Sequence, residues 1–221
     1  MPGFHDFVVE LFDIATGRRI GDPLGLTANN GGLRFSPDGR YLVSGMSNGR
    51  VAVFDVRSHR LVTELPVYPG LVHANVVEFS PDGRLLAVGG DPGQVSAWNV
   101  GSWTRAWTAN EVTSDQTGFI SFSPDGQLVS VDGGGKLLLF NAATGEAIGT
   151  PLTTTDLGSG FAPDGRSVLV MDGSAGAHRI DIDPQSWVRR ACDIAGRDLT
   201  ADEWQRYLPD QPRMPVCPGA G

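Results

Sequence analysis

The chain has 221 residues, 40% of them hydrophobic, with 30 Gly, 15 Pro and only two Cys, and its formal net charge is −8. This acidic balance argues against a nucleic-acid partner, because binding to phosphates depends on clustered Lys and Arg. No apolar run approaches the ~18 residues that span a bilayer, and the first residues lack the basic and apolar regions of a secretion signal, so we expect a cytoplasmic protein that does not contact membranes.

The first predicted elements, in residues 4–26, are two strands without a preceding pair. The segment "FVVELFD" begins almost at the start of the sequence, the turn "ATG" follows it, and a second strand leads to residue 26. In the rest of the chain, a pair of this kind closes a unit of four strands. We therefore interpret residues 4–26 as half of a unit, which leaves a strand edge at residues 7–13 open to self-association.

The complete unit is marked by a hexapeptide that returns four times. It reads "FSPDGR" at 35–40 and 79–84, "FSPDGQ" at 122–127 and "FAPDGR" at 161–166. The phenylalanines that open these copies are 44, 43 and 39 residues apart. A period near 40 residues is typical of β-propellers built from four-stranded blades.

Short apolar runs bounded by Gly, Pro, Asp and Asn fill each unit, and such runs predict strands rather than helices. Eighteen or nineteen residues after the motif phenylalanine, each unit has a large apolar residue followed by Asp or Asn. These pairs are Phe54-Asp55, Trp98-Asn99, Phe140-Asn141 and Ile180-Asp181. The sequence thus predicts an all-β propeller of about four and a half blades, partial or open. After the half blade come blades 27–68, 69–110, 111–154 and 155–183, the last with only three clear strands.

The repeated aspartates allow two readings. Asp38, Asp82, Asp125 and Asp164 stand at nearly equal spacing, which is compatible with a row of ligands or catalytic acids. Each also stands in "PDG", where Pro sets φ near −65°, Asp bonds to its own backbone, and Gly takes a positive φ. We favour turns between the first and second strands of each blade.

Residues 184–221 are predicted to form a helical cap followed by an extended tail. Asp183 caps the first helix and Gly196 ends it, whereas Thr200 and Glu203 form a capping box for a second helix. The apolar faces consist of Trp187, Ala191 and Ala195 in the first helix, and Trp204 and Tyr207 in the second.

The two cysteines are Cys192, on the first predicted helix, and Cys217, in the tail. In the cytoplasm we favour a reduced pair that packs as small apolar groups. A disulfide that ties the tail to the helix is the alternative.

Few residues qualify for catalysis or metal binding. Ser47 in "GMSNG" would need a strand-to-helix elbow to act as a nucleophile, but a turn between strands is predicted there. The "GGGK" that ends at Lys136 is followed by no predicted helix, as a phosphate loop would be. The histidines have no spacing suited to zinc; they are His5, His59, His73 and His178. We predict no catalytic residue, no metal site and no cofactor.

The "FSPDG" turns, the aromatic-Asp/Asn strand ends and the "ATG" turns together resemble the WD-repeat family of β-propellers, over residues 4–183. Endings such as "FDIATGRRIGDPL", and the tail at 186–209, are most similar to the C-terminal propeller regions of bacterial, actinobacterial-type multidomain signalling proteins.

The sequence departs from the family pattern in two ways. Trp98 keeps the family tryptophan, whereas Phe12, Phe54 and Phe140 replace it. The family's Gly-His dipeptide is absent, because His73 falls about three residues late, and we therefore do not carry over the family's buried Asp–His–Ser–Trp network.

In the resembling proteins, such a propeller serves as a sensor or scaffold. The resemblance implies a non-catalytic module that binds protein partners, and the variable connections at 66–75, 110–118 and 153–158 offer a surface for them. Since a half blade fits a closed ring poorly, we expect the C-terminal part of a larger propeller. The alternatives are a small-molecule-binding or hydrolytic propeller that uses the channel mouth, and a truncated remnant without function.

Overall fold

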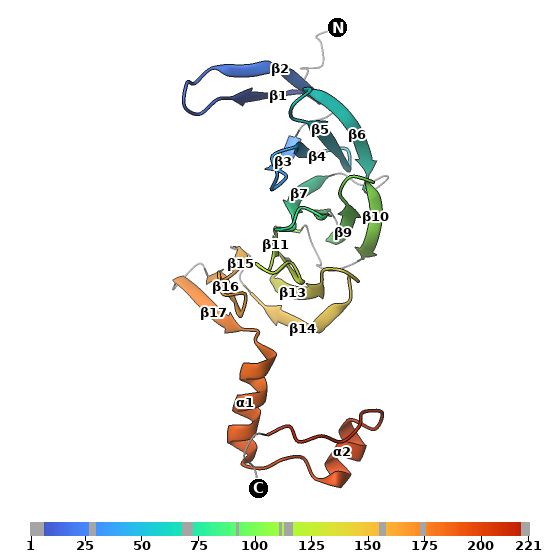
Figure 1. Cartoon of the computed structure of the whole chain (residues 1–221), viewed down its shortest axis with the longest axis vertical. Helices are drawn as coiled ribbons and strands as arrows, with labels where there is room; N and C mark the ends of the chain where they lie inside the picture. Colours follow the sequence, from blue (N-terminus) through green and yellow to red (C-terminus); the bar gives the residue numbers. More distant parts are fainter. Residues whose placement is uncertain are drawn as a thin grey trace.

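The computed structural model describes residues 7–26, 30–67, 73–91, 93–110, 112, 117–154, 158–172 and 176–217. Within these residues, five antiparallel sheets follow one another along an open arc, and two helices lie beyond the last sheet (Figure 1). We number the sheets 1 to 5 along the chain. The predicted fold class, an open β-propeller with a helical tail, is confirmed. The residue limits predicted between blades and tail stay a prediction.

The strands of every sheet pair in chain order. Sheet 1 consists of β1 (Phe7–Phe12) and β2 (Arg19–Leu26). Sheet 2 consists of β3 (Asn30–Phe35), β4 (Tyr41–Met46), β5 (Arg50–Asp55) and β6 (Arg60–Pro66). Sheet 3 consists of β7 (Ala74–Phe79), β8 (Leu85–Gly90), β9 (Gln94–Asn99) and β10 (Thr104–Ala109). Sheet 4 consists of β11 (Phe119–Phe122), β12 (Leu128–Gly133), β13 (Lys136–Asn141) and β14 (Ala147–Thr153). Sheet 5 consists of β15 (Ser159–Phe161), β16 (Ser167–Asp172) and β17 (Gly176–Asp181).

The hydrophobic core lies between neighbouring sheets. Val43 and Val53 of sheet 2, for example, pack with Val77, Phe79 and Val88 of sheet 3, and all five are buried. Equivalent clusters join sheets 1 and 2, sheets 3 and 4, and sheets 4 and 5. The internal sheets therefore depend on their neighbours along the arc for the burial of both faces, as in other repeat proteins.

The repeated motif forms a tight turn after the first strand of sheets 2 to 5. In sheet 2, Gly39 has a φ of 70° and donates its N–H to the Ser36 carbonyl at 2.8 Å. Asp38 Oδ1 accepts from the Ser36 hydroxyl at 2.6 Å and from the Arg40 N–H at 3.0 Å. The same bonds recur in sheets 3 and 4. The prediction that these aspartates form turns is confirmed.

A second repeated position fastens neighbouring sheets together. Five residues after the large residue that ends the third strand, the backbone is left-handed, at Gly17, His59, Trp103 and Gly145. The Trp103 ring packs edge-on against Tyr41 of the preceding sheet, with centroids 5.1 Å apart. His59 Nδ1 likewise lies 3.3 Å from the Asp22 carbonyl oxygen of sheet 1. Beside Gly145, the space is filled by a side chain of the preceding sheet, Trp107.

Both predicted helices are present. α1 (Pro184–Ala195) follows Asp183, whose side chain accepts a bond from the helix N-terminus, and ends at Gly196 with a φ of 66°. α2 (Ala201–Tyr207) follows Thr200, which forms the predicted capping box with Glu203. Across the described residues, no helix is long and apolar enough to cross a membrane.

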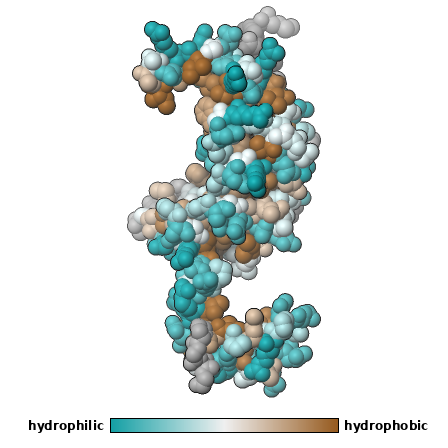
Figure 2. Space-filling view, in the orientation of Figure 1, coloured by the Kyte–Doolittle hydropathy of each residue, from teal (hydrophilic) through white to brown (hydrophobic). Residues whose placement is uncertain are grey.

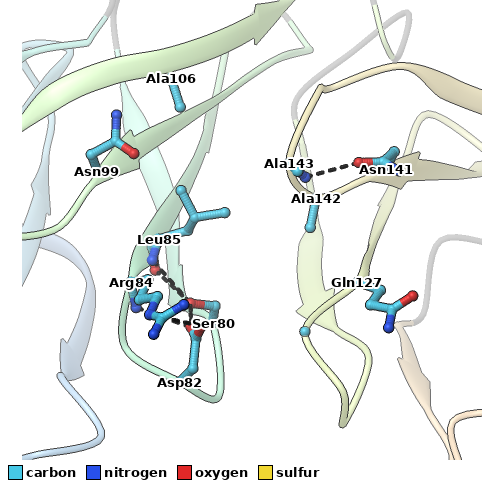
Figure 3. A pocket seen from close by; sticks show the side chains of 11 residues that line it. Ser80, Asp82, Arg84, Leu85, Asn99, Ala106, Gln127, Asn141, Ala142 and Ala143 are labelled. Atoms are coloured by element: carbon cyan, nitrogen blue, oxygen red, sulfur yellow. Dashed lines mark hydrogen bonds and ion pairs between the residues drawn. The ribbon is translucent and has the colours of Figure 1, made fainter.

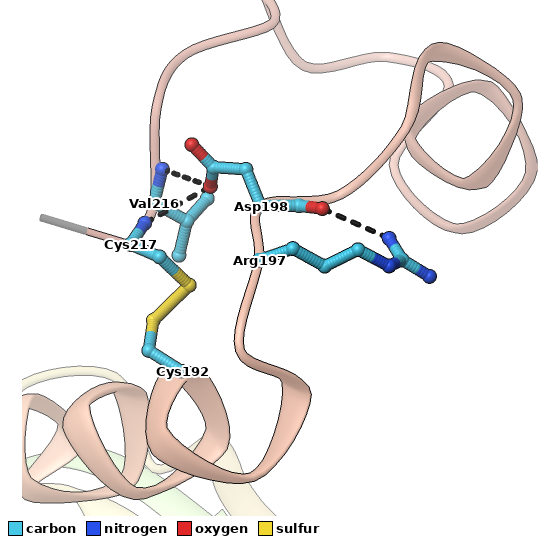
Figure 4. Close-up of a disulfide and its surroundings, with 5 residues drawn as sticks. All are labelled: Cys192, Arg197, Asp198, Val216 and Cys217. Atoms are coloured by element: carbon cyan, nitrogen blue, oxygen red, sulfur yellow. Dashed lines mark hydrogen bonds between the residues drawn. A yellow bond between two sulfur atoms is a disulfide. The ribbon is translucent and has the colours of Figure 1, made fainter. Parts of the chain in front are cut away.

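The prediction that the two cysteines form a reduced pair is wrong. Cys192 on α1 and Cys217 in the tail form a disulfide (Figure 4). The chain turns back after α2, so that two residues 25 positions apart meet. Sequence spacing does not reveal this return. The cytoplasmic location, on which the reduced state was argued, stays a prediction.

Candidate interaction surfaces

Residues at equivalent positions of the repeat show which surfaces of the arc are uncovered. The large residue at the end of the third strand is buried at Phe54 (2% exposed), Trp98 (5%) and Phe140 (3%), each against the preceding sheet. The equivalent residue of β1, Phe12, is 55% exposed. Hydrophobic residues are visible on the β1–β2 hairpin in Figure 2. In the described chain, the face of sheet 1 that points away from sheet 2 is therefore uncovered.

The phenylalanine of the repeated motif is also exposed in sheet 2, although it is buried in sheets 3 and 4. Phe79 and Phe122 are 5% and 8% exposed, whereas Phe35 is 52% exposed. Phe79 packs with residues on the second and third strands of the preceding sheet, such as Val43 of β4. Sheet 1 contains only the equivalents of the third and fourth strands. The exposed ring of Phe35 thus marks the place that two further strands would cover.

The opposite end of the arc has its own uncovered face. Leu169 and Met171 of β16 are 40% and 55% exposed. The positions equivalent to Leu169 in β4 and β8, Val43 and Ala87, are 0% exposed because the next sheet covers them. A cavity of about 430 Å³ opens beside Leu169 and Met171, and Phe119 and Phe161 also line it.

Each uncovered face also carries an ion pair. Leu169 is paired across the sheet with Arg179, where the internal sheets have Val53, Ala97 or Leu139. Arg179 donates to Asp164 Oδ2 and to Ser167 Oγ, both at 2.7 Å. At the other end, Arg19 Nη1 lies 3.1 Å from Glu10 Oε1. Such charged groups beside exposed apolar side chains keep an open face solvated.

In the described chain, β1 and β17 each have one unpaired edge, whereas the equivalent strands of the other sheets are paired on both sides. Among the described residues, β1 pairs only with β2, and β17 pairs only with β16. The equivalent third strands β5, β9 and β13 are paired on both sides. The open edge predicted at residues 7–13 is therefore present, and a second one lies on β17.

The connections predicted to bind partners lie only partly within the described residues. The segments 66–75, 110–118 and 153–158 are each interrupted by residues outside the described part of the chain.

The first strands place opposite charges on neighbouring sheets. Arg34 Nε donates to Glu78 Oε2 at 2.8 Å, which joins β3 to β7. The equivalent residues of the next two sheets are Ser121 and Gly160. The contact forms because the two residues occupy the same position of adjacent repeats, and it was not predicted from the sequence.

The candidate chemical residues lie in ordinary turns and strands. Ser47 lies in the turn between β4 and β5, as predicted, and Lys136 begins β13 after a two-residue turn. His59 lies in the turn between β5 and β6, His73 lies directly before β7, and His178 lies on β17. His5 lies outside the described residues. Within the described chain, no group of three His, Cys, Asp or Glu residues is placed to hold a metal ion.

A cavity of about 550 Å³ lies between sheets 3 and 4 (Figure 3). Its polar lining serves the turns: Asp82 accepts from Ser80 Oγ at 2.6 Å, and Asn141 Oδ1 accepts from the Ala143 N–H at 2.9 Å. The Ser80 hydroxyl and then the Arg84 N–H lower the pKa of Asp82. A carboxylate held ionised in this way stabilises its turn and is poorly suited to carry a proton at neutral pH.

Comparison with known proteins agrees with this architecture. A family model described as WD domain, G-beta repeat matches residues 31–55 and 70–99, which contain the first three strands of sheets 2 and 3. The match supports a WD-repeat family. Comparison with curated proteins gives no significant match.

Trp98 also forms a local contact on its own strand. Its Nε1 donates to Ser96 Oγ at 3.0 Å, and Ser96 is fully buried. Both residues lie on β9, two positions apart, so this contact does not depend on His73.

Proposed function

We propose that this chain is a non-catalytic scaffold that binds protein partners through the two uncovered ends of the arc. WD repeats generally mediate protein–protein interaction and are typically non-catalytic. The observation that carries the proposal is the exposure of Phe12 and Met171 at positions that internal sheets bury. Exposed apolar side chains bordered by charged groups are typical of surfaces that bind proteins.

The partner that fits these ends has β-strands. We propose that the chain is the C-terminal part of a larger propeller in a bacterial regulatory protein, and that further blades cover the ends. The exposed ring of Phe35 and the edge of β17, which no strand of the described residues pairs, support this proposal, because strands of a neighbouring blade would cover the first and pair with the second. Without that cover, the edge of β1 also favours self-association.

Partner capture with matched surface variants tests the proposed function. Phe12→Asp and Met171→Asp each place a charge on one end, and both residues are exposed, so the fold is expected to tolerate the changes. Ile194→Asp is the control, since Ile194 is 79% exposed on α1, away from both ends. We expect proteins captured by the wild type and by Ile194→Asp to be lost from at least one end variant.

Equal capture by all four proteins would contradict the role of the ends. The hydrolytic or small-molecule alternative predicts something different: a ligand-specific rise in melting temperature with metals or lactones, and no protein retained. A thermal-shift screen run beside the capture experiment separates the two functions.

A further inference from the structure

The C-terminal segment forms a lobe outside the arc (Figure 1). α1 continues from β17 and has no buried residue, and Val188 and Ile194 on its apolar side are 38% and 79% exposed. After α2, residues 208–217 run back to α1 as an extended tail. The lobe therefore lacks a closed hydrophobic core around its longest helix.

The tail is held by few noncovalent bonds, and these come from the segment between α1 and the tail. Asp198 Oδ1 accepts from the N–H groups of Val216 at 2.8 Å and Cys217 at 2.9 Å (Figure 4). Trp204 Nε1 donates to the Gln211 carbonyl at 2.8 Å. Between residues 208–217 and α1 itself, the disulfide is the only bond in the described part of the chain.

Packing between the tail and α1 is also incomplete. A cavity of about 300 Å³ separates them, lined on the helix side by Val188, Ala191 and Ala195 and on the other side by Leu199 and Val216. Both cysteines border this cavity and are only half-buried. The disulfide therefore lies near the surface of the lobe, where a reductant can approach it without unfolding of the blades.

We propose that the Cys192–Cys217 disulfide is a redox-responsive clamp on the C-terminal lobe. A dithiol reductant of the thioredoxin class opens it: one thiolate attacks a sulfur atom of the disulfide, the bond between Cys192 and Cys217 breaks, and a mixed disulfide forms. The second thiol of the reductant then breaks the mixed disulfide and releases the cysteine of this chain. This leaves two thiols on this chain and a disulfide on the reductant. The tail then separates from α1 and exposes the apolar side chains beneath it.

Hydrogen exchange of the intact protein tests the clamp. The protein is measured oxidised, and again after thioredoxin, its reductase and NADPH. We expect exchange at Val216 and Cys217 to accelerate by about tenfold or more on reduction, because the closed loop no longer limits the motion of the tail. Exchange in β4 and β8 stays unchanged. A Cys192→Ser/Cys217→Ser double variant is expected to match the reduced protein without any reductant.

Three results would overturn the proposal. The first is a disulfide that the thioredoxin system leaves intact in the folded protein. The second is unchanged exchange of the tail after complete reduction, which would mean that the noncovalent bonds of the tail suffice to hold it. The third is a loss of protection in β4 and β8 on reduction, which would make the disulfide a support of the whole fold and not a local clamp.

Discussion

At the scale of the residue, the motif fixes one turn in each of sheets 2 to 4 through a serine side chain, an aspartate side chain and a positive φ at glycine. The sequence predicted the roles of Asp38 and Gly39, because both follow from the chemistry of turns. It did not predict the role of Ser36, which is 4% exposed, donates to Asp38 and accepts from the Tyr41 N–H at 2.8 Å. A serine before proline favours the start of a turn, but it does not show that the hydroxyl bonds to the aspartate carboxylate. The available sign was its recurrence in three of the four motif copies.

A glycine substitution tests the turn. Gly126 has a φ of 71°. A Cβ atom added at Gly126 would lie 3.7 Å from Cδ of Pro81 in the preceding motif. We expect Gly126→Ala to lower the free energy of unfolding by about 1 kcal/mol, since alanine is strained at a positive φ. Gly25→Ala is the control, because Gly25 has neither a positive φ nor a close neighbour. Urea denaturation measures both, and equal effects would contradict the turn argument.

The motif carboxylates predict a dependence of stability on pH. The serine hydroxyl, and then a backbone N–H, lower the pKa of Asp82 and of Asp125 below the ordinary value of 3.8. Because the folded pKa is lower than the unfolded pKa, the stabilisation is complete above the unfolded value and is lost as the pH falls through the folded value. We expect the free energy of unfolding to decrease as the pH falls below about 4.

Removal of the hydroxyls tests this cause. The double variant Ser80→Ala/Ser123→Ala raises the folded pKa of both aspartates toward the ordinary value, so the decrease below about pH 4 becomes shallower. Ser102→Ala is the control, since Ser102 bonds to Thr104 and not to a carboxylate. Denaturation midpoints over a pH series provide the measurement, and an unchanged slope in the double variant would contradict the assignment.

At the scale of the element, strands and helices were predicted well because their signals are local. Alternating apolar residues, turn residues and helix caps lie within a few positions of the strand or helix they define. Contacts between elements were missed where a backbone position changes its partner from repeat to repeat. His59, Trp103 and Gly145 share one left-handed position, but only the structure shows that it fastens each sheet to the preceding one. The disulfide was missed for a related reason, since the chain must return past α2 to form it.

The contact between Trp107 and Gly145 gives a prediction about one of the contacts that join neighbouring sheets. Trp107 of sheet 3 is 8% exposed, stacks on Phe140 of sheet 4, and donates from Nε1 to the Ala142 carbonyl at 2.8 Å. We expect Trp107→Ala to cost about 3–5 kcal/mol of unfolding free energy, from the cavity and the lost bond. Trp187→Ala, on the exposed α1, is the control and is expected to cost about 1 kcal/mol or less. Similar losses for both would rule out this fastening.

At the scale of the whole molecule, the repeat period predicted the open propeller, but not which residues it leaves uncovered. Leu169 and Met171 lie in an apolar run like those of internal strands. Their side chains are exposed because the described chain contains no further sheet beside sheet 5. A local sequence pattern does not show whether such a sheet is present. Arg179 was the available sign, because it replaces the valine, alanine or leucine of the internal sheets.

The open edge of β1 predicts association that a charge would weaken. Val8 is 51% exposed on this edge strand. We expect the wild-type chain to associate as its concentration rises, and Val8→Lys to reduce that association, because lysine on an edge strand opposes pairing with another strand. Multi-angle light scattering measures the mass of both, with Ile194→Lys as the control. A wild-type chain that stays monomeric, or a Val8→Lys variant that associates equally, would contradict this role of the edge.

The central claim is that both ends of the arc are blade faces without cover, and hydroxyl-radical footprinting of the monomeric fraction tests it most directly. The account predicts strong oxidation of Phe12, Phe35 and Met171 in the free chain, protection of the equivalent residues Phe54 and Phe79, and protection of the end residues once a partner is bound. Equal protection of Phe12 and Phe54 in the free monomer would contradict the account.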